Sequence, residues 1–257
     1  MSMKHGDFTD LAKKYKNRPA YNKKLINFIS KQITSENNKY NIAEIGAGTG
    51  KLTKMLAEMN FSISAVEPND EMRKVGQEYT NTKSVQWSKG TGENTKLDSG
   101  CYDWVIMASS FHWTDPNLSL PEFYRLLKPN GYLTIIWNPR NIKASKLHVD
   151  IENIIYSYIP NMKRKSSGER TQTETWENVL TQTGHFKDVI FSEISFMEQM
   201  SIERYMGAWE SVNDIRVQAG EGNFKKILKE IENAISHLDG IISVPYKNTS
   251  WTAQRVD

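Results

Sequence analysis

The sequence of 257 residues has few of the features that would assign it to a specialised class of protein. It contains a single cysteine, Cys101, which can form neither an internal disulfide nor a cysteine-rich metal site. The histidines at positions 5, 148, 185 and 237 are scattered without the spacing of metal ligands. We therefore expect no bound metal and no stabilisation by disulfides.

Long apolar runs and a strong excess of charge are also missing. No segment approaches the about 18 uninterrupted apolar residues of a membrane-spanning helix. Residues 1–10 are polar and do not resemble a signal peptide, so we expect a cytoplasmic protein without membrane contacts. A net charge of +3 is too small to indicate a nucleic-acid partner. The one dense basic run, Lys163-Arg164-Lys165 before Ser166-Ser167-Gly168, is typical of a solvated loop.

Short apolar segments alternate with segments of helical periodicity through the first 140 residues. The expected strands are 41–45, 62–66, 84–87, 102–108 and 132–137, and the expected helices are 25–33, 51–60, 70–79 and 120–127. Almost wholly apolar strands separated by helices indicate a parallel sheet that is covered on both faces. The sequence therefore predicts an α/β fold with a doubly wound sheet.

The alternation breaks after Asn138. Helical periodicity then covers 146–158, 173–182, 202–217 and 224–238, and strands are expected at 189–196 and 250–256. We expect a single domain over 1–257, with a core of about 35–140 plus the C-terminal strands. Helical cap segments at about 142–182 and 198–245 would pack over the carboxyl edge of the sheet, where such folds bind ligands.

The most informative segment is the turn from Glu44 to Gly50, Glu-Ile-Gly-Ala-Gly-Thr-Gly, between an expected strand and an expected helix. Glycine accepts a positive φ and lets a ligand approach the backbone closely. A dinucleotide-binding loop would need its third glycine at position 51, which is Lys51. Glu67 ends the next strand, 17 positions after Gly50, where it can accept hydrogen bonds from both ribose hydroxyls of an adenosine. The alternative is a simple turn with Glu67 in solvent.

From about Tyr15 to the C-terminus, the sequence resembles the class I S-adenosylmethionine-dependent methyltransferases, and among them the small-molecule enzymes related to trans-aconitate and farnesoic acid methyltransferases. The resemblance is carried by the glycine turn with Glu67 and by three further motifs. These are Tyr15-x-x-Arg18-Pro19-x-Tyr21, Ser110-Phe111-His112-Trp113 and Arg125-Leu126-Leu127-Lys128-Pro129-Asn130-Gly131. The resemblance implies a seven-stranded, mostly parallel sheet with an antiparallel last strand.

The resemblance also implies S-adenosyl-L-methionine as the cofactor, S-adenosyl-L-homocysteine as its product, and a set of residues around the cofactor. The turn would surround the methionine part and Glu67 would hold the ribose. The implied cofactor residues are Glu44, Gly46, Ala47, Gly48, Gly50, Glu67, Pro68, Met72, Thr91, Gly92, Glu93, Ala108, Ser109, Arg18 and Tyr21. Many relatives have an acidic residue and alanine in place of Thr91-Gly92, which makes the contacts to adenine less certain. For Tyr15, Arg18 and Tyr21 the alternative is packing at the surface.

The expected reaction is an in-line transfer of the methyl group to a small-molecule acceptor. The candidate catalytic residues are His112, as a base or as a hydrogen-bond donor, and Tyr15; the alternative for His112 is a histidine that fastens a loop. Candidate substrate residues are Trp113, Trp137, Asn138 and Trp176, and for aromatic residues at helical spacing the alternative is core packing. Three other functions stay open: cyclisation or cleavage of the cofactor, methylation of a macromolecule, and cofactor binding without catalysis. The sequence also leaves open the identity of the acceptor and the oligomeric state.

Overall fold

The computed structural model describes residues 11–33, 40–163 and 175–257, which fold into two compact units. The first, here called the sheet unit, consists of Ala20–Asn138, Gly168–Ile194 and Asn248–Asp257. The second, here called the helical unit, consists of Met1–Pro19, Pro139–Ser167 and Ser195–Lys247. Part of the basic run (Arg164–Gly168), His5 and the first residues of the helix expected at 173–182 lie outside the described residues.

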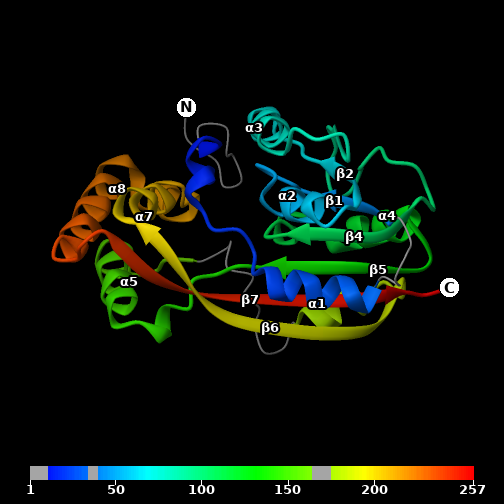
Figure 1. Cartoon of the computed structure of the whole chain (residues 1–257). Coiled ribbons are helices and arrows are strands. Elements are labelled where there is room, and N and C mark those ends of the chain that lie inside the picture. Colours follow the sequence, from blue (N-terminus) through cyan, green and yellow to red (C-terminus); the bar gives the residue numbers. More distant parts are fainter. Residues whose placement is uncertain (1–10, 34–39, 164–174) are drawn as a thin grey trace. The chain divides into compact units, whose positions relative to one another are not determined.

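A seven-stranded sheet with the strand order β3-β2-β1-β4-β5-β7-β6 forms the centre of the fold (Figure 1). The strands are β1 (Asn41–Ile45), β2 (Ser62–Val66), β3 (Val85–Ser88), β4 (Tyr102–Ala108), β5 (Leu127–Trp137), β6 (Phe186–Ser201) and β7 (Ile241–Arg255). Strands β1 to β5 pair in parallel, and β7 pairs antiparallel with β5. The predicted mostly parallel sheet with an antiparallel last strand is therefore confirmed.

Helices cover both faces of the sheet within the sheet unit. They are α1 (Lys23–Ile33), α2 (Lys51–Glu58), α3 (Asp70–Thr80), α4 (Pro116–Leu126) and α6 (Trp176–Thr181). Side chains of α1 and α2 pack with Trp104 and Ile106 of β4, whereas side chains of α4 and α6 pack with Val105 and Met107. Successive residues of a strand point to opposite faces, so a strand covered on both sides has to be apolar throughout.

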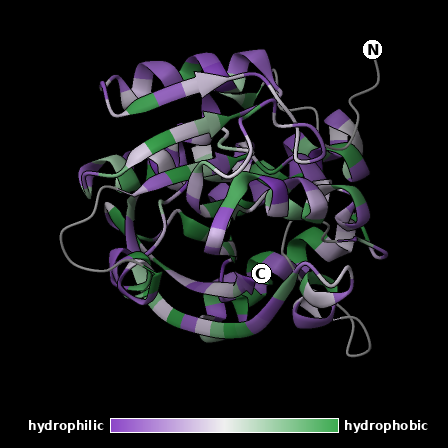
Figure 2. Cartoon of the chain, turned by 90° about the vertical axis from the view of Figure 1, so that its right-hand side faces the viewer, coloured by the Kyte–Doolittle hydropathy of each residue, from purple (hydrophilic) through white to green (hydrophobic). Residues whose placement is uncertain are grey.

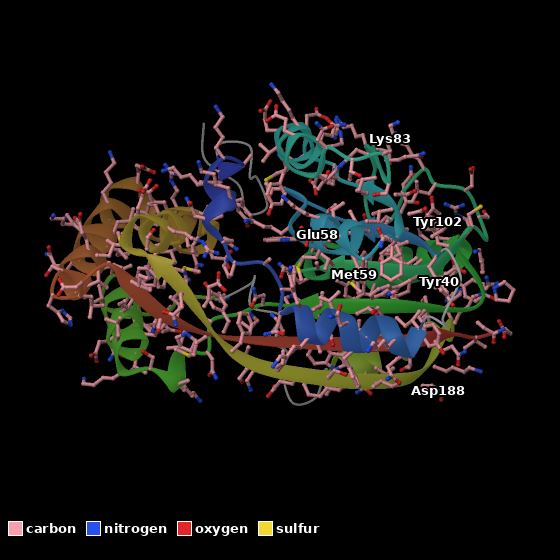
Figure 3. All side chains as sticks on the ribbon, viewed as in Figure 1. Tyr40, Glu58, Met59, Lys83, Tyr102 and Asp188 are labelled. Carbon is pink, nitrogen blue, oxygen red and sulfur yellow. The ribbon has the colours of Figure 1, made fainter. Side chains whose placement is uncertain are left out.

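Polar contacts add to this packing. The Tyr102 hydroxyl donates across β1 to the Ser64 hydroxyl on β2 at 3.0 Å, and the Tyr102 ring can be followed in Figure 3. The exposed residues of α3 make this helix mostly hydrophilic in Figure 2. Its N-terminus is capped by Asn69, whose side-chain oxygen accepts a hydrogen bond from the Met72 N–H at 3.0 Å.

The helical unit has a hydrophobic core of its own. It contains α5 (Lys146–Tyr158), α7 (Ile202–Glu210) and α8 (Asn213–Ile235), together with the adjoining ends of β6 and β7. Ile155, Ile227 and Ile231 lie at the centre of this core and are completely buried. No helix in the described part of the chain has the length and apolar character needed to cross a membrane.

Several expected elements differ from those observed. The helix expected over 202–217 is interrupted, because α7 ends at Glu210 and α8 begins at Asn213. Helix α8 runs to Ile235 and has non-helical backbone at Gly220, between the segments expected as 202–217 and 224–238. The strands expected at 189–196 and 250–256 are parts of the longer β6 and β7. Helix α6 was expected within the cap segment 142–182, but it belongs to the sheet unit because Trp176 packs into the core there.

Candidate functional site

The glycine turn leaves β1 through three glycines with a left-handed backbone. The φ angles are 68° at Gly46, 58° at Gly48 and 77° at Gly50. The N–H groups of Gly46 and Ala47 donate to the carbonyl oxygen of Val66 at 2.8 and 3.0 Å, which fastens the turn to the end of β2. A turn of this kind is difficult for residues with a side chain, since a positive φ is favourable almost only for glycine.

The glycines also differ in the space beside them. A Cβ atom on Gly46 would lie 2.7 Å from the Cβ atom of Ser110, whereas one on Gly48 would have Met72 Cε at 3.8 Å as its nearest neighbour. Ser110 additionally donates its hydroxyl to the carbonyl oxygen of Ile45 at 3.2 Å. Gly46 is thus required by protein packing, and Gly48 leaves its α-carbon open to an approaching ligand.

Glu67 binds this turn directly. Its carboxylate oxygens accept hydrogen bonds from the N–H of Gly48 at 2.8 Å and from the N–H of Asn69 at 2.9 Å. Burial raises the pKa of the Glu67 carboxyl, while the two N–H groups and the Arg73 charge oppose this shift. Each carboxylate oxygen still has a second lone pair and can accept further hydrogen bonds.

Glu44 lies at the end of β1 and is only 1% exposed. Its Oε2 atom is buried and has no hydrogen-bond partner among the described residues. Burial raises the pKa of Glu44 to about 8; the Thr53 hydroxyl opposes the shift and the Glu67 charge adds to it. Burial thus favours the protonated form of this carboxyl.

The segment before α1 and the end of β4 meet beside the turn. Tyr21 and Ser109, both expected at the cofactor site, share a hydrogen bond of 2.9 Å between their hydroxyls. Ser109 has a φ of 53°, which is a strained conformation for a residue other than glycine. The preceding Ala108 ends β4 and is half-buried.

The loop after β3 is fixed by contacts within the protein. Gly92 lies against Thr114, since a Cβ atom there would be 2.5 Å from Thr114 Cγ2. Glu93 Oε1 accepts a hydrogen bond from the Asp115 N–H at 3.0 Å, and the Thr91 N–H donates to the carbonyl of Asn94. Pro68 is exposed and Met72 is buried beside Gly48. These contacts hold the loop in place, and the expected contacts of Thr91, Gly92 and Glu93 with adenine stay predictions.

His112 lies in a short 3-10 helix, Phe111–Trp113, after β4. Its Nδ1 atom accepts a hydrogen bond from the Trp137 indole N–H at 3.2 Å. The hydrogen of the neutral imidazole is therefore on Nε2. Trp113 is 38% exposed, and its ring centroid lies 4.7 Å from that of His112. No three His, Cys, Asp or Glu side chains gather into a metal-binding group in the described residues.

The other three candidate substrate residues have structural partners. Trp137 and Trp176 are buried in the core, where their rings stack at 4.5 Å. Asn138 donates to the carbonyl of Ala20 at 3.0 Å and accepts from the Asn248 side chain at 2.7 Å. The alternative interpretation, core packing, therefore describes the environment of the two tryptophans.

Tyr15 and Arg18 belong to the helical unit. The Arg18 guanidinium donates to the Ser211 hydroxyl at 2.8 Å and to the Ser211 carbonyl at 2.9 Å, and it lies 4.2 Å from the centre of the Tyr15 ring. Arg18 thereby binds the C-terminus of α7, where a cation is favourable. The expected contacts of both residues with the cofactor stay predictions.

Comparison with known proteins finds similarity to methyltransferases. Residues 43–135 match the family described as Methyltransferase domain. An uncharacterized methyltransferase of Mycobacterium tuberculosis is 39% identical over 39% of this chain and 40% of its own length. An uncharacterized methyltransferase of Schizosaccharomyces pombe is 35% identical over 52% of each chain. The match thus spans about half or less of the length of these relatives.

Solved structures show the same architecture. A structure from Anaeromyxobacter dehalogenans, named as a type II methyltransferase, superposes with a TM-score of 0.66 over 92% of this chain and 97% of its own, at 17% identity. Phosphoethanolamine N-methyltransferase 2 of Haemonchus contortus, solved with S-adenosyl-L-methionine, has a TM-score of 0.53 over 91% of this chain and 53% of its own, at 14% identity. At these identities the likeness shows the fold.

Proposed function

We propose that the chain is an S-adenosylmethionine-dependent methyltransferase that acts on a small molecule, because residues 43–135 match the methyltransferase domain family and the fold is the Rossmann-like fold of solved methyltransferases. The observation that carries the proposal is the left-handed glycine turn whose Gly48 N–H is bound by the buried carboxylate of Glu67. This arrangement combines an exposed backbone surface with an acceptor for the hydroxyls of a sugar.

The residues of the turn fit the two polar ends of S-adenosylmethionine. The unpartnered, buried Oε2 of Glu44 suits the ammonium of the methionine part, because a cation would stabilise the ionised carboxylate. The free lone pairs of Glu67 suit the ribose hydroxyls. The open side of Gly48 allows the nucleoside to approach the backbone.

When bound, the cofactor supplies a methyl group that is already activated on a sulfonium, so the protein has mainly to position the reactants. The His112 ring, with its hydrogen on Nε2, is suited to help position a reactant. With Nδ1 held by Trp137, the ring carries its hydrogen on Nε2; this nitrogen is buried, and it would donate to an acceptor molecule that enters beside it. We propose His112 as a donor that orients the acceptor; action as a base would require the ring to lose this hydrogen.

Cofactor binding is tested by calorimetry with S-adenosylhomocysteine on wild type and on two matched glycine variants. Gly46→Ala introduces a Cβ atom that overlaps Ser110, and we expect affinity to fall by about tenfold or more. Gly100→Ala places alanine at a similar φ of 65° with no atom within 4 Å, and we expect unchanged affinity. Absence of binding by wild type, or preferential binding of a nicotinamide or flavin, would overturn the proposal.

The reaction is tested by incubating the protein with S-adenosylmethionine, with and without a small-molecule extract. The proposal expects S-adenosylhomocysteine to accumulate only when the extract is present. Formation of methylthioadenosine without an added acceptor would instead indicate cyclisation or cleavage of the cofactor. Cofactor binding without turnover in any extract would favour a macromolecular acceptor or a non-catalytic role.

A further inference from the structure

Arg140 occupies an unusual environment in the helical unit. It follows the end of β5 by three residues, and its backbone forms a bridge with Tyr246. Its guanidinium carbon lies 3.9 Å from the centre of the Trp209 ring. Trp209 is itself only 2% exposed, so the aromatic side chain provides a rigid, buried base beneath the cation.

The Arg140 side chain makes no hydrogen bond or ion pair with any other residue in the described part of the chain, and its Nε atom is buried. Two other arginines of the helical unit form ion pairs with glutamates. Arg204 forms an ion pair with Glu198 at 2.7 Å, and Arg216 forms one with Glu221 at 2.8 Å. Arg140 is therefore a partly buried cation that lacks a counter-charge, a state that is unfavourable unless an anion binds.

The groups around Arg140 are neutral hydrogen-bonding side chains. The Tyr205 hydroxyl lies 3.3 Å from His148 Nε2, and both residues are almost completely buried. Burial, with the Arg140 charge adding to it, lowers the pKa of His148 to about 4, so the imidazole is neutral at physiological pH. The Trp209 indole N–H is buried and faces the Tyr205 hydroxyl. The cluster thus has one positive charge, and no carboxylate of the described residues forms an ion pair with it.

We propose that Arg140, stacked on Trp209, binds an anionic ligand with two or more oxygens, a carboxylate or a phosphate. The planar guanidinium presents paired N–H donors that match such groups, and stacking on an aromatic ring keeps its plane fixed. Arg140 is half-buried, so an anion from solution can reach it while remaining shielded from water on one side. The inference concerns a site within the helical unit and goes beyond the proposed methyl transfer.

The test measures binding of malonate and of inorganic phosphate to the full-length protein at constant ionic strength, by calorimetry and by thermal stabilisation. We expect wild type to bind at least one of the two anions, and Arg140→Gln to weaken that binding by about tenfold or more. Arg140→Lys keeps the charge but loses the paired donors, so we expect an intermediate loss. A preference for malonate would identify a carboxylate ligand, and a preference for phosphate would identify a phosphorylated one.

Arg216→Gln is the matched control, because Arg216 also lies over an aromatic ring, Phe224, but already has Glu221 as its partner. We expect this variant to bind the anions as wild type does. Equal binding by wild type and Arg140→Gln, or no binding of either anion by wild type, would overturn the inference. Affinity for S-adenosylhomocysteine separates the two proposals: we expect Arg140→Gln to retain it, whereas its absence in wild type would contradict the proposed function instead.

Discussion

At the scale of single residues, the two buried glutamates of the glycine turn have opposite surroundings. Glu67 accepts two backbone hydrogen bonds that stabilise its ionised form. Glu44 has a buried oxygen without a partner and a pKa raised to about 8. Glu44 is therefore mostly protonated at neutral pH in the free protein, and a bound cation would favour its ionisation.

We predict that affinity for S-adenosylhomocysteine depends on the ionisation of Glu44. A bound ammonium lowers the pKa of Glu44 below about 8, so the ligand prefers the ionised form. Affinity should therefore rise with pH from about 6 to about 8 and then level off, as measured by calorimetry in buffers of different pH. The complex should also release a proton on formation below pH 8.

Glu44→Gln provides the control for this effect. Glutamine keeps the shape of the side chain but does not titrate, so we expect the rise in affinity between pH 6 and 8 to disappear. An unchanged pH profile in Glu44→Gln would assign the effect to another group and would remove the argument for a cation at Glu44.

Not all residues of the site could be predicted from the sequence. The glycine turn and Glu67 are recognisable because their roles follow from local spacing along the chain. Ser110 and Asn248 are not, since their contacts with Ile45 and Asn138 join residues 65 and 110 positions apart. Trp137 and Trp176 were predicted to line the substrate site, whereas their rings stack in the core. The sequence does not distinguish these two environments, because aromatic residues both line pockets and fill cores.

At the scale of elements, a buried asparagine joins three segments of the sheet unit. Asn248, which is completely buried on β7, accepts from the Asn22 N–H at 2.6 Å. Its NH₂ group donates to the Asn138 side chain at 2.7 Å and to the Trp137 carbonyl at 3.3 Å. The start of α1 and the end of β5 are thereby attached to the same side chain.

We predict that Asn248→Ala lowers the free energy of unfolding by at least about 1–3 kcal/mol, because the buried partner groups lose their hydrogen bonds. Chemical denaturation would measure the change. Asn27→Ala replaces an exposed asparagine on α1 and should change the stability by less than about 0.5 kcal/mol. Equal effects of the two substitutions would show that the Asn248 hydrogen bonds contribute no net stability.

The positions of most elements could be predicted, but not all their ends. Apolar periodicity located β4 and α5 at their observed residues, because both bury a regular pattern of side chains. The break after Glu210 was missed; the backbone there is bound by Arg18, which is distant in sequence and donates to the Ser211 carbonyl. The full length of β6 was missed because exposed and partly buried residues alternate along this edge strand without long apolar runs.

At the scale of the molecule, the two units have separate hydrophobic cores. The sheet unit contains the glycine turn and its glutamates, and the helical unit contains Arg140 and a core of its own. The expected cap segments at about 142–182 and 198–245 overlap most of the helical unit, but periodicity could not show that this unit has a core of its own, because the helices of both units have the same amphipathic pattern. The doubly wound arrangement of the first five strands, in contrast, follows from the alternation of strands and helices.

We predict that a cavity in the core of the helical unit destabilises the protein without weakening cofactor binding. Ile227→Ala should lower the free energy of unfolding by about 2–5 kcal/mol, since Ile227 is completely buried. Affinity for S-adenosylhomocysteine, measured well below the unfolding temperature, should stay within about twofold of wild type. A parallel loss of affinity would show that the two cores are energetically coupled.

Each unit is assembled from three separate stretches of the chain, and those of one alternate with those of the other. The two units are therefore joined at five points of the chain. Exchange of the whole helical unit with that of a homologue would need a junction at each of these five points, whereas exchange of Ala20–Asn138 alone would replace residues of the sheet unit only.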